Sequence, residues 1–262
     1  MSRPISAKPK KISSDKMFDI FNYALLTLLI IAVAYPLYYV LIASISDPYE
    51  VYGGKTFLLP SKITFEGYLR VFQEESIARG YLNSIYYTVL GTVISVALII
   101  TTGYCVSKKT LPFRKAIMVF YVFTMYFNGG LIPTYLVVSK LGMLNSVWAL
   151  ILPGGVAVFN VIVARTFFES SIPEDLYEAA AIDGSSNLRT FVRIALPLAK
   201  PILAVMVIFT MVAYWNDWFT ALIYMNEKSK YPLQLALRQV LIQSQATATM
   251  MGNMDGGYAE AN

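Results

Sequence analysis

The chain has 262 residues, of which 56% are hydrophobic and 14% are charged, and its mean hydropathy is +0.55. Soluble domains carry about 25% charged residues, so this chain has too little polar surface to cover a water-soluble globule, and we expect lipid to surround much of it. With no histidine and one cysteine, an intrachain disulfide is excluded, and we expect no catalytic residues, no metal site and no cofactor.

The first predicted element is a membrane-spanning helix behind a basic N-terminal tail, residues 1–17. The apolar run after the tail is longer than the ~7–15 residues of a secretory signal peptide, so we expect it to be retained. A helix needs about 20 apolar residues to cross a bilayer. Five stretches, which together occupy residues 18–225, meet this length. They are Phe18–Ala43, Leu82–Val106, Ala116–Val138, Ser146–Phe168 and Leu198–Met225.

Two of the predicted spans contain residues that interrupt helices. Asn128-Gly129-Gly130 and Pro133 lie in the third span, and Pro153-Gly154-Gly155 lie in the fourth. Because lipid offers no hydrogen-bonding partner to the backbone, we expect each interruption to lie against protein or to mark where a span bends or ends.

A few small or polar side chains inside the predicted spans have structural interpretations. Gly91 and Gly103 are predicted to permit close contact between helices, and Cys105 to be a small buried hydrophobe. Asn160 is predicted to make a hydrogen bond between helices rather than to contact a ligand.

Basic residues set the predicted orientation. They cluster in segments 1–17, 108–115 and 165–200, which lie on one side if the spans alternate. Positive segments favour the cytoplasmic side, so we expect a multi-pass protein of a bacterial-type plasma membrane with a cytoplasmic N-terminus. We interpret these clusters as anchors to membrane lipid rather than as ligand or nucleic-acid sites. The segments expected outside are 46–81, 139–145 and 226–262.

The loop 169–197 between the fourth and fifth predicted spans contains a helix-turn-helix pattern. Ser171 and Glu174 have the spacing of a capping box, and the helix through Leu176–Ile182 is predicted to stop at Gly184. Ser185 or Ser186 then caps a second helix. In that helix the residues predicted to share one apolar face are Leu188, Phe191, Val192 and Ala195.

The first helix of this loop has a narrow face made of Glu178 and the small residues Ala179, Ala180 and Ala181. A narrow helix can seat deeply in a groove of another protein. An amphipathic helix lying on the membrane surface is the alternative, and the residues by themselves leave both interpretations open.

The fifth predicted span carries Tyr214-Trp215-Asn216-Asp217-Trp218 near its outer end. Aromatic faces pack against sugar C–H groups, and Asn and Asp side chains bond hydroxyls, so one interpretation is a substrate pathway. The other is an aromatic belt at the membrane interface.

The loop 169–197 resembles the Glu-Ala-Ala loop that is the signature of binding-protein-dependent ABC importer permeases. Glu178-Ala179-Ala180 is followed after three residues by Gly184, and nine further residues precede Ile194, with Leu196-Pro197 completing the motif. Asp183 fits the form found in sugar importers. The resemblance implies that Glu178, Ala179, Ala180, Asp183 and Gly184 couple the chain to a separate ATP-binding cassette ATPase.

The resemblance extends over nearly the whole chain and implies an all-α permease fold of the maltose-transporter type. Tyr35-Pro36, residues 128–135 (NGGLIPTY) and Trp215–Trp218 are similar to carbohydrate importer permeases, the middle stretch most of all to those for complex oligosaccharides or polysaccharide fragments. The implied partners are a second permease in a heterodimer and an extracytoplasmic solute-binding protein. Family members normally have a sixth span, so we expect that 226–262 is an external loop truncated before it; a five-span variant is the alternative.

Other functions are disfavoured by the sequence. There is no phosphate-binding G-x-x-x-x-G-K-[ST] loop, so we expect no ATP binding by the chain itself. A secondary transporter would show inverted repeats and intramembrane charges, an enzyme would show clustered polar side chains, and a scaffold or sensor would carry a soluble domain. A permease for another small solute remains the nearest alternative.

Overall fold

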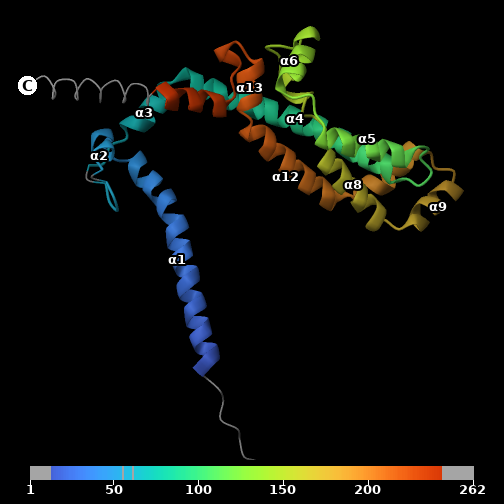
Figure 1. Ribbon diagram of the computed structural model, residues 1–262, viewed down its shortest axis with the longest axis horizontal. Helices are drawn as coiled ribbons and strands as arrows, with labels where there is room; N and C mark the ends of the chain where they lie inside the picture. The colour runs from blue at the N-terminus through green and yellow to red at the C-terminus, as the bar shows by residue number, and fades with distance from the viewer. Residues whose placement is uncertain (1–12, 55, 61, 244–262) are drawn as a thin grey trace, which may run out of the picture. The chain divides into compact units, whose positions relative to one another are not determined.

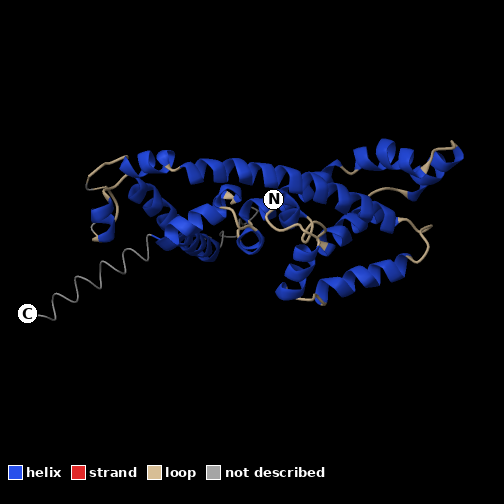
Figure 2. Ribbon diagram, turned by 90° about the horizontal axis from the view of Figure 1, so that it is seen from above, coloured by secondary structure: helices blue, strands red, loops and turns tan. Residues whose placement is uncertain are grey.

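The computed structural model describes residues 13–54, 56–60 and 62–243, which belong to two compact units that divide between Glu74 and Glu75. Each unit is built from helices (Figure 1). Within the described residues the sole β-pairing is an isolated bridge between Ser46 and Ile63, and Figure 2 shows helices joined by loops. The all-α prediction is confirmed.

The first unit consists of a long helix and a short irregular segment that folds against its end. Its helices are α1 (Ser13–Ser44), α2 (Pro48–Tyr52) and α3 (Glu66–Gln73). The Tyr38 hydroxyl donates to the Leu58 carbonyl at 2.7 Å, and the hydroxyls of Ser44 and Tyr68 lie 2.9 Å apart. α1 matches the first predicted span, and its apolar side chains are exposed along most of its length, whereas Ile42 near its C-terminal end is buried.

The second unit is arranged around α4 (Glu75–Ser107), a helix about 50 Å long at 1.5 Å per residue. It lies along both α8 and α12, which the ribbon views show beside it (Figure 1). The other elements, in chain order, are α5 (Arg114–Tyr126), α6 (Leu131–Lys140), α7 (Val147–Ile151), α8 (Val158–Ser170), α9 (Glu174–Ile182), α10 (Asn187–Thr190), the π-helix η1 (Phe191–Ala195), α11 (Leu196–Leu198), α12 (Lys200–Asn216), α13 (Phe219–Tyr224), the 3₁₀ turn η2 (Lys228–Lys230) and a last helix over residues 233–243.

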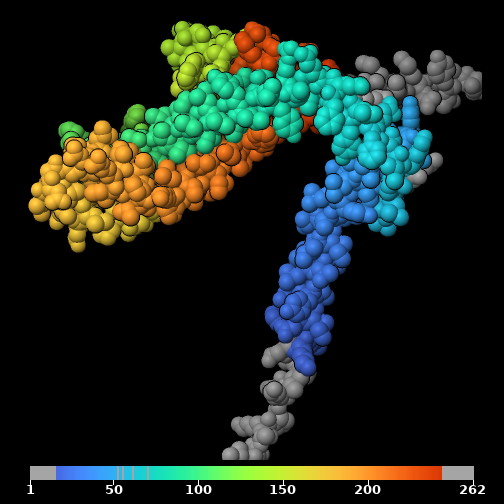
Figure 3. All heavy atoms as spheres, turned by 180° about the vertical axis from the view of Figure 1, so that it is seen from behind, coloured from blue at the N-terminus to red at the C-terminus, as the bar shows by residue number. Residues whose placement is uncertain are grey.

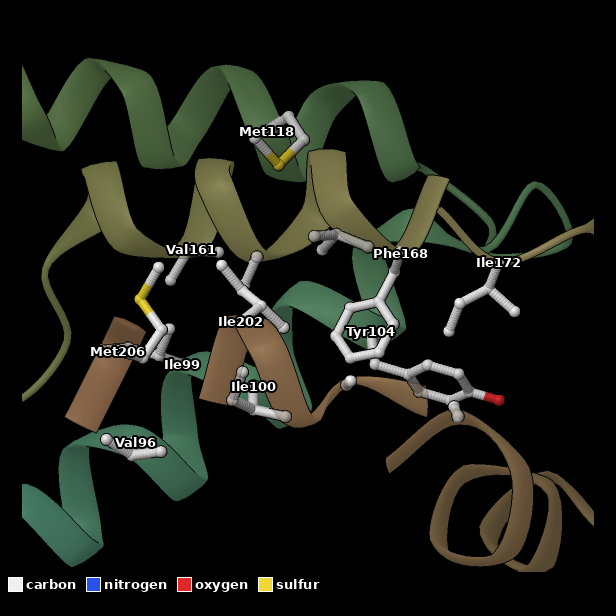
Figure 4. Packing of buried hydrophobic residues seen from close by; sticks show 14 residues of the cluster. Val96, Ile99, Ile100, Tyr104, Met118, Val161, Phe168, Ile172, Ile202 and Met206 are labelled. Atoms are coloured by element: carbon white, nitrogen blue, oxygen red, sulfur yellow. The ribbon is translucent and has the colours of Figure 1, made fainter. Parts of the chain in front are cut away.

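The main apolar core lies where α4, α8 and α12 meet, with Met118 of α5 added at one side (Figure 4). Its members on α4 recur at helical spacing, because one face of that helix is turned to its two neighbours. Burial of this face supplies the hydrophobic stabilisation that holds the three helices together. The labelled members besides Met118 are Val96, Ile99, Ile100, Tyr104, Val161, Phe168, Ile172, Ile202 and Met206.

Two glycines of α4 allow the close contacts predicted for them. A Cβ on Gly103 would lie 2.7 Å from Cβ of Ala164 on α8, and a Cβ on Gly91 would lie 2.8 Å from the ring of Tyr214 on α12. Cys105, in contrast, is exposed. The prediction of a buried cysteine is wrong, because Gly103, Tyr104 and Ser107 face the core and residue 105 points away from it.

The predicted interruptions of the third and fourth spans are breaks between separate helices. α5 and α6 meet at an angle of 111° across residues 127–130, where Gly130 has φ +83°. α7 and α8 are separated by residues 152–157. The predicted continuous helix of the fifth span is also wrong: α12 begins at Lys200 and ends at Asn216, because the backbone at Asp217 is extended.

Among the described residues, two helices are long and apolar enough to cross a membrane by themselves: α1 from Lys16 onward, and α4. Two bent pairs pass the same test jointly, namely α5 with α6, and residues Asn187–Leu198 with α12 at an angle of 80°. The number of spans therefore remains a prediction. The same holds for the N-terminal tail and the truncation before a sixth span, since residues 1–12 and 244–262 lie outside the described part of the chain.

Segment 226–236, which was predicted to be an external loop, packs on the N-terminal end of α4. The Asn83 side-chain amide donates to the carbonyls of Ser229 (2.8 Å) and Tyr231 (3.0 Å), and the Ser84 hydroxyl accepts from the Leu233 amide at 2.8 Å. Side chains of α4 thus satisfy backbone groups of a segment almost 150 residues away, which orders this loop.

Candidate functional site

The first candidate site is the coupling segment, α9 to α11, which lies at one end of the second unit, where α4 terminates and away from α13 (Figures 1 and 3). α9 begins with Glu174 directly after Pro173, whose extended backbone occupies the N-cap position. The predicted capping box is wrong, because the N-cap lies two residues beyond Ser171. The Glu174 carboxylate instead forms an ion pair with Lys109.

The predicted stop at Gly184 is confirmed. Gly184 has φ +70°, a left-handed conformation that glycine adopts without strain. Its amide donates to the Ala181 carbonyl at 3.1 Å, and the Ser185 amide donates to the Ala180 carbonyl at 2.9 Å. These two bonds form a Schellman C-cap. Ser186 then caps α10 by accepting from the Arg189 amide at 3.4 Å.

The apolar face predicted for the second helix is partly wrong. Ala195 is buried and Phe191 packs on the core, but Leu188 and Val192 are 71% and 50% exposed. The cause is the π-turn over Phe191–Ala195, which adds a residue to the turn and shifts the helical phase. Thr190 takes a buried position that the 3.6-residue period did not predict.

Aromatic side chains connect this segment to the C-terminal end of α4. The ring of Tyr104 lies 4.7 Å from that of Phe191, 6.1 Å from that of Tyr177 and 5.5 Å from that of Phe168, measured between centroids. The Lys108 ammonium lies over the ring of Tyr177 and 4.7 Å from the centre of the Tyr104 ring. Burial lowers the pKa of Lys108 to about 8, against an opposing effect of Glu174, and burial raises the pKa of Tyr177 to about 12.

Further charges tie the neighbouring helices together. Glu169 on α8 accepts from Arg114 on α5 at 2.7 Å and from Arg165 on its own helix at 2.9 Å. All three side chains are about one quarter to one third exposed, so each pair is screened less than a surface pair. α5 is thereby fixed against α8 beside the coupling segment.

Four of the five predicted coupling residues lie on the surface. Glu178, Ala179, Asp183 and Gly184 are exposed, whereas Ala180 is turned inward and buried. The sequence-based prediction missed Ile182, which is 87% exposed. A large apolar side chain at the last position of α9, directly after three alanines, was the available signal for a contact residue.

The second candidate site is a cavity of about 520 Å³ beside the breaks that follow α7 and α12. Its volume falls within the range of small-molecule sites, about 300–1,000 Å³. The walls come from α4, α7, α8, α12 and α13, and from the turn between α7 and α8. The lining residues are Ile99, Leu150, Pro153, Gly154, Gly155, Ala157, Asn160, Phe209, Thr210, Ala213, Tyr214, Asn216, Asp217, Thr220 and Tyr224.

The cavity brings together three of the five residues predicted for a substrate pathway, Tyr214, Asn216 and Asp217. The two tryptophans are not among its lining residues. Trp215 makes an edge-to-face contact with Tyr81 at 6.2 Å, and Trp218 packs under the guanidinium of Arg238 at 3.6 Å. Trp215 lies within α12 and is turned toward Tyr81 of α4, and Trp218 lies beyond the end of α12.

Sequence reasoning missed other polar residues of the cavity. Asn160 lines it and makes no side-chain hydrogen bond to another described residue, so the predicted interhelical bond is not found. Thr210 and Thr220 also line it. The Pro153-Gly154-Gly155 break was the signal that irregular backbone lies here beside a cavity.

Comparison with known proteins places the chain in a family. Residues 5–254 match the family described as "Binding-protein-dependent transport system inner membrane component". The chain is 38% identical to the polygalacturonan/rhamnogalacturonan transport system permease protein YtcP of Bacillus subtilis, over 93% of this chain and 85% of that protein. It is 39% identical to protein LplC of the same organism, over 90% and 80% of the two chains.

A solved structure supports the same assignment. The chain superposes with a TM-score of 0.84 on a bacterial ABC transporter involved in the import of the acidic polysaccharide alginate, at 33% identity, covering 95% of this chain and 89% of that one. Permeases of this kind are non-catalytic subunits that work with an ATPase and a solute-binding protein. Since the family match covers nearly its whole length, the chain belongs to the binding-protein-dependent inner membrane components, the permeases of ABC importers.

Proposed function

We propose that this chain is the permease subunit of an importer for an oligosaccharide or polysaccharide fragment, with its N-terminus and coupling segment in the cytoplasm. The carbohydrate assignment is supported by the relatives named for polygalacturonan and alginate transport. The observation that carries the coupling role is the exposed surface of α9, which includes Glu178 and Ile182.

In this proposal α9 seats in a cleft of a separate ATPase, and its movement reaches the membrane helices by two routes. One runs through Tyr177 and the Tyr104 ring to α4. The other runs through η1 and α11, which continue into α12. A second permease completes the pathway, and a solute-binding protein outside the cell delivers the saccharide. A permease for another small solute is the alternative, and uptake of matched saccharide and non-saccharide solutes separates the two.

The docking role is tested by reversing one charge on α9. Glu178→Lys, in the complete importer reconstituted with its ATPase, second permease and binding protein, is expected to lower substrate-stimulated ATP hydrolysis at least tenfold, about 1.4 kcal/mol. Lys140→Glu, an exposed reversal at the end of α6, is the matched control and should leave it unchanged. If Glu178→Lys and Ile182→Glu both keep stimulated hydrolysis and still co-purify with the ATPase, α9 does not dock to the ATPase.

The orientation is tested separately by thiol labelling in whole cells. In a Cys105→Ser background, Ile182→Cys should react with a membrane-permeant maleimide and be spared by an impermeant one. Labelling of Ile182→Cys by the impermeant reagent would place α9 outside the cell and overturn the proposal. Ser229→Cys, in the segment expected outside, provides the reference of opposite sidedness.

A further inference from the structure

The polar groups of the cavity beside the α12–α13 break are nearly all uncharged. Asn160 and Asn216 contribute amides, and Thr210 and Thr220 contribute hydroxyls. Asp217 is the single charged residue of the lining, and neither lysine nor arginine is among the described residues that line it. These groups can donate to and accept from hydroxyls, whereas no lining side chain offers a positive charge to an anion.

The Asp217 carboxylate is held in place by the backbone. Its Oδ1 accepts from the Thr220 amide at 3.1 Å, at the start of α13. No hydrogen bond to another described residue is recorded for the second carboxylate oxygen, Oδ2, and the side chain lines the cavity. A fixed acceptor of this kind can bond sugar hydroxyls without reorganising.

Helix dipoles do not offset this negative charge. The C-terminal ends of α7 and α12 turn partial negative charges toward the cavity, and the N-terminal ends of α8 and α13 turn partial positive ones toward it. These two pairs cancel to first order. The full charge of Asp217 therefore sets the sign of the potential in the cavity.

We propose that this cavity receives an uncharged, hydroxyl-rich part of the saccharide and that Asp217 excludes uronate carboxylates from it. The inference rests on the proposed carbohydrate function, and it sets this cavity apart from what a transporter of an acidic polysaccharide such as alginate requires. Two like charges about 4 Å apart repel by about 1 kcal/mol in water and about 4 kcal/mol at an effective dielectric constant of 20. A uronate is thus disfavoured here by roughly 5-fold to 1,000-fold relative to the neutral sugar.

The substitution Asp217→Asn tests the charge and leaves the local fold intact, because an asparagine Oδ1 accepts the same bond from the Thr220 amide. A Thr220→Cys reporter in a Cys105→Ser background places a thiol in the lining. Asn160→Cys is the second reporter, and it serves if the first does not fold. Leu141→Cys, an exposed position at the end of α6, gives the reference reactivity.

The measurement uses the complete reconstituted importer and two thiol reagents of equal size, one cationic and one anionic. At the cavity thiol the cationic reagent should react at least tenfold faster, relative to the reference thiol, and Asp217→Asn should remove this preference. Galactotriose should protect the thiol, and trigalacturonate should do so only in Asp217→Asn. Equal protection of the unsubstituted cavity by both sugars, protection by neither, or no reagent preference would each overturn the inference.

ATP-driven uptake in the presence of the binding protein distinguishes this failure from failure of the proposed function. If the importer takes up saccharide but the cavity thiol shows no reagent preference or no protection, the inference about Asp217 fails and the proposed function stands. If no saccharide is taken up while another solute is, the proposed carbohydrate function fails, whatever the reagents report.

Discussion

The two ends of α4 hold their partners by different means. At the C-terminal end, Tyr104 and Lys108 contact the coupling segment through ring-to-ring and charge-to-ring contacts, and the ion pair of Lys109 with Glu174 joins two exposed side chains. At the N-terminal end, Asn83 and Ser84 bond directly to backbone groups of segment 226–236, and the Tyr87 hydroxyl adds a bond to the Lys230 carbonyl at 3.0 Å.

This difference has a mechanical consequence. Hydrogen bonds to the backbone depend steeply on angle and fix the position of a segment, whereas aromatic contacts tolerate ring centroids from about 4.5 to 7 Å apart. The C-terminal end can therefore let α9 shift under a push, while the N-terminal end keeps segment 226–236 in place. A helix with a movable attachment at one end and a fixed attachment at the other suits a subunit that transmits motion.

The largest effect is expected for Tyr104→Ala, which removes the ring at the centre of the coupling-end contacts. Truncation of a buried aromatic residue costs about 3–5 kcal/mol, and Tyr104 is buried against Phe168 and Phe191. We expect a lower melting temperature in detergent and faster amide exchange in α9, with exchange in segment 226–236 unchanged. Tyr126→Ala, an exposed tyrosine at the end of α5, is the control. Equal acceleration at both ends of α4 would contradict independent attachment.

A smaller effect, at the other end of α4, is expected for Asn83→Ala. The substitution leaves the Ser229 and Tyr231 carbonyls without their donor, which costs about 0.5–1.5 kcal/mol per bond because water can reach these groups. Amide exchange should accelerate at Leu233 while α9 keeps its protection. Asn22→Ala on α1, where the side chain is exposed, is the control. Unchanged exchange at Leu233 would show that Ser84 alone holds segment 226–236 in place.

The features of both ends that sequence could predict are local ones. Gly184 ends α9 because its left-handed conformation is a property of one residue, and the small size of Gly103 signalled a close helix contact. Asp217 shows the opposite case. The apolar run 198–225 is long enough to span a membrane, so the sequence did not indicate that α12 ends at Asn216.

Non-local pairings explain most of the remaining errors. Glu174 was expected to cap its own helix but pairs with Lys109, 65 residues earlier in the chain. The Leu188 and Val192 face was displaced by a π-turn, which has no period in the sequence that would predict it. Which polar residues line the cavity depends on how separate helices end beside one another, so Asn160 and Asp217 could not be paired in advance.

The smallest expected effect concerns the charge on Lys108. Burial lowers its pKa to about 8 from a usual value of 10.5, so the ammonium that lies on the Tyr177 ring loses its proton as pH rises through about 8. The cation–π attraction is then lost, and it is worth about 0.5–2 kcal/mol. Substrate-stimulated ATP hydrolysis should therefore fall by about 2- to 30-fold between pH 7 and pH 9 if this contact transmits the push on α9.

Lys108→Arg separates this contact from general effects of pH, because a guanidinium keeps its charge throughout that range. The variant should show a flatter profile than the unsubstituted importer, whereas Lys140→Arg should show the same profile. Stability should change in the other direction: the folded chain gives up the Lys108 proton at about pH 8 and the unfolded chain at about pH 10.5, so the free energy of unfolding rises across that window. Coupling that falls while stability rises would assign the loss to the Lys108–Tyr177 contact; parallel falls in both would assign it to unfolding of the coupling end.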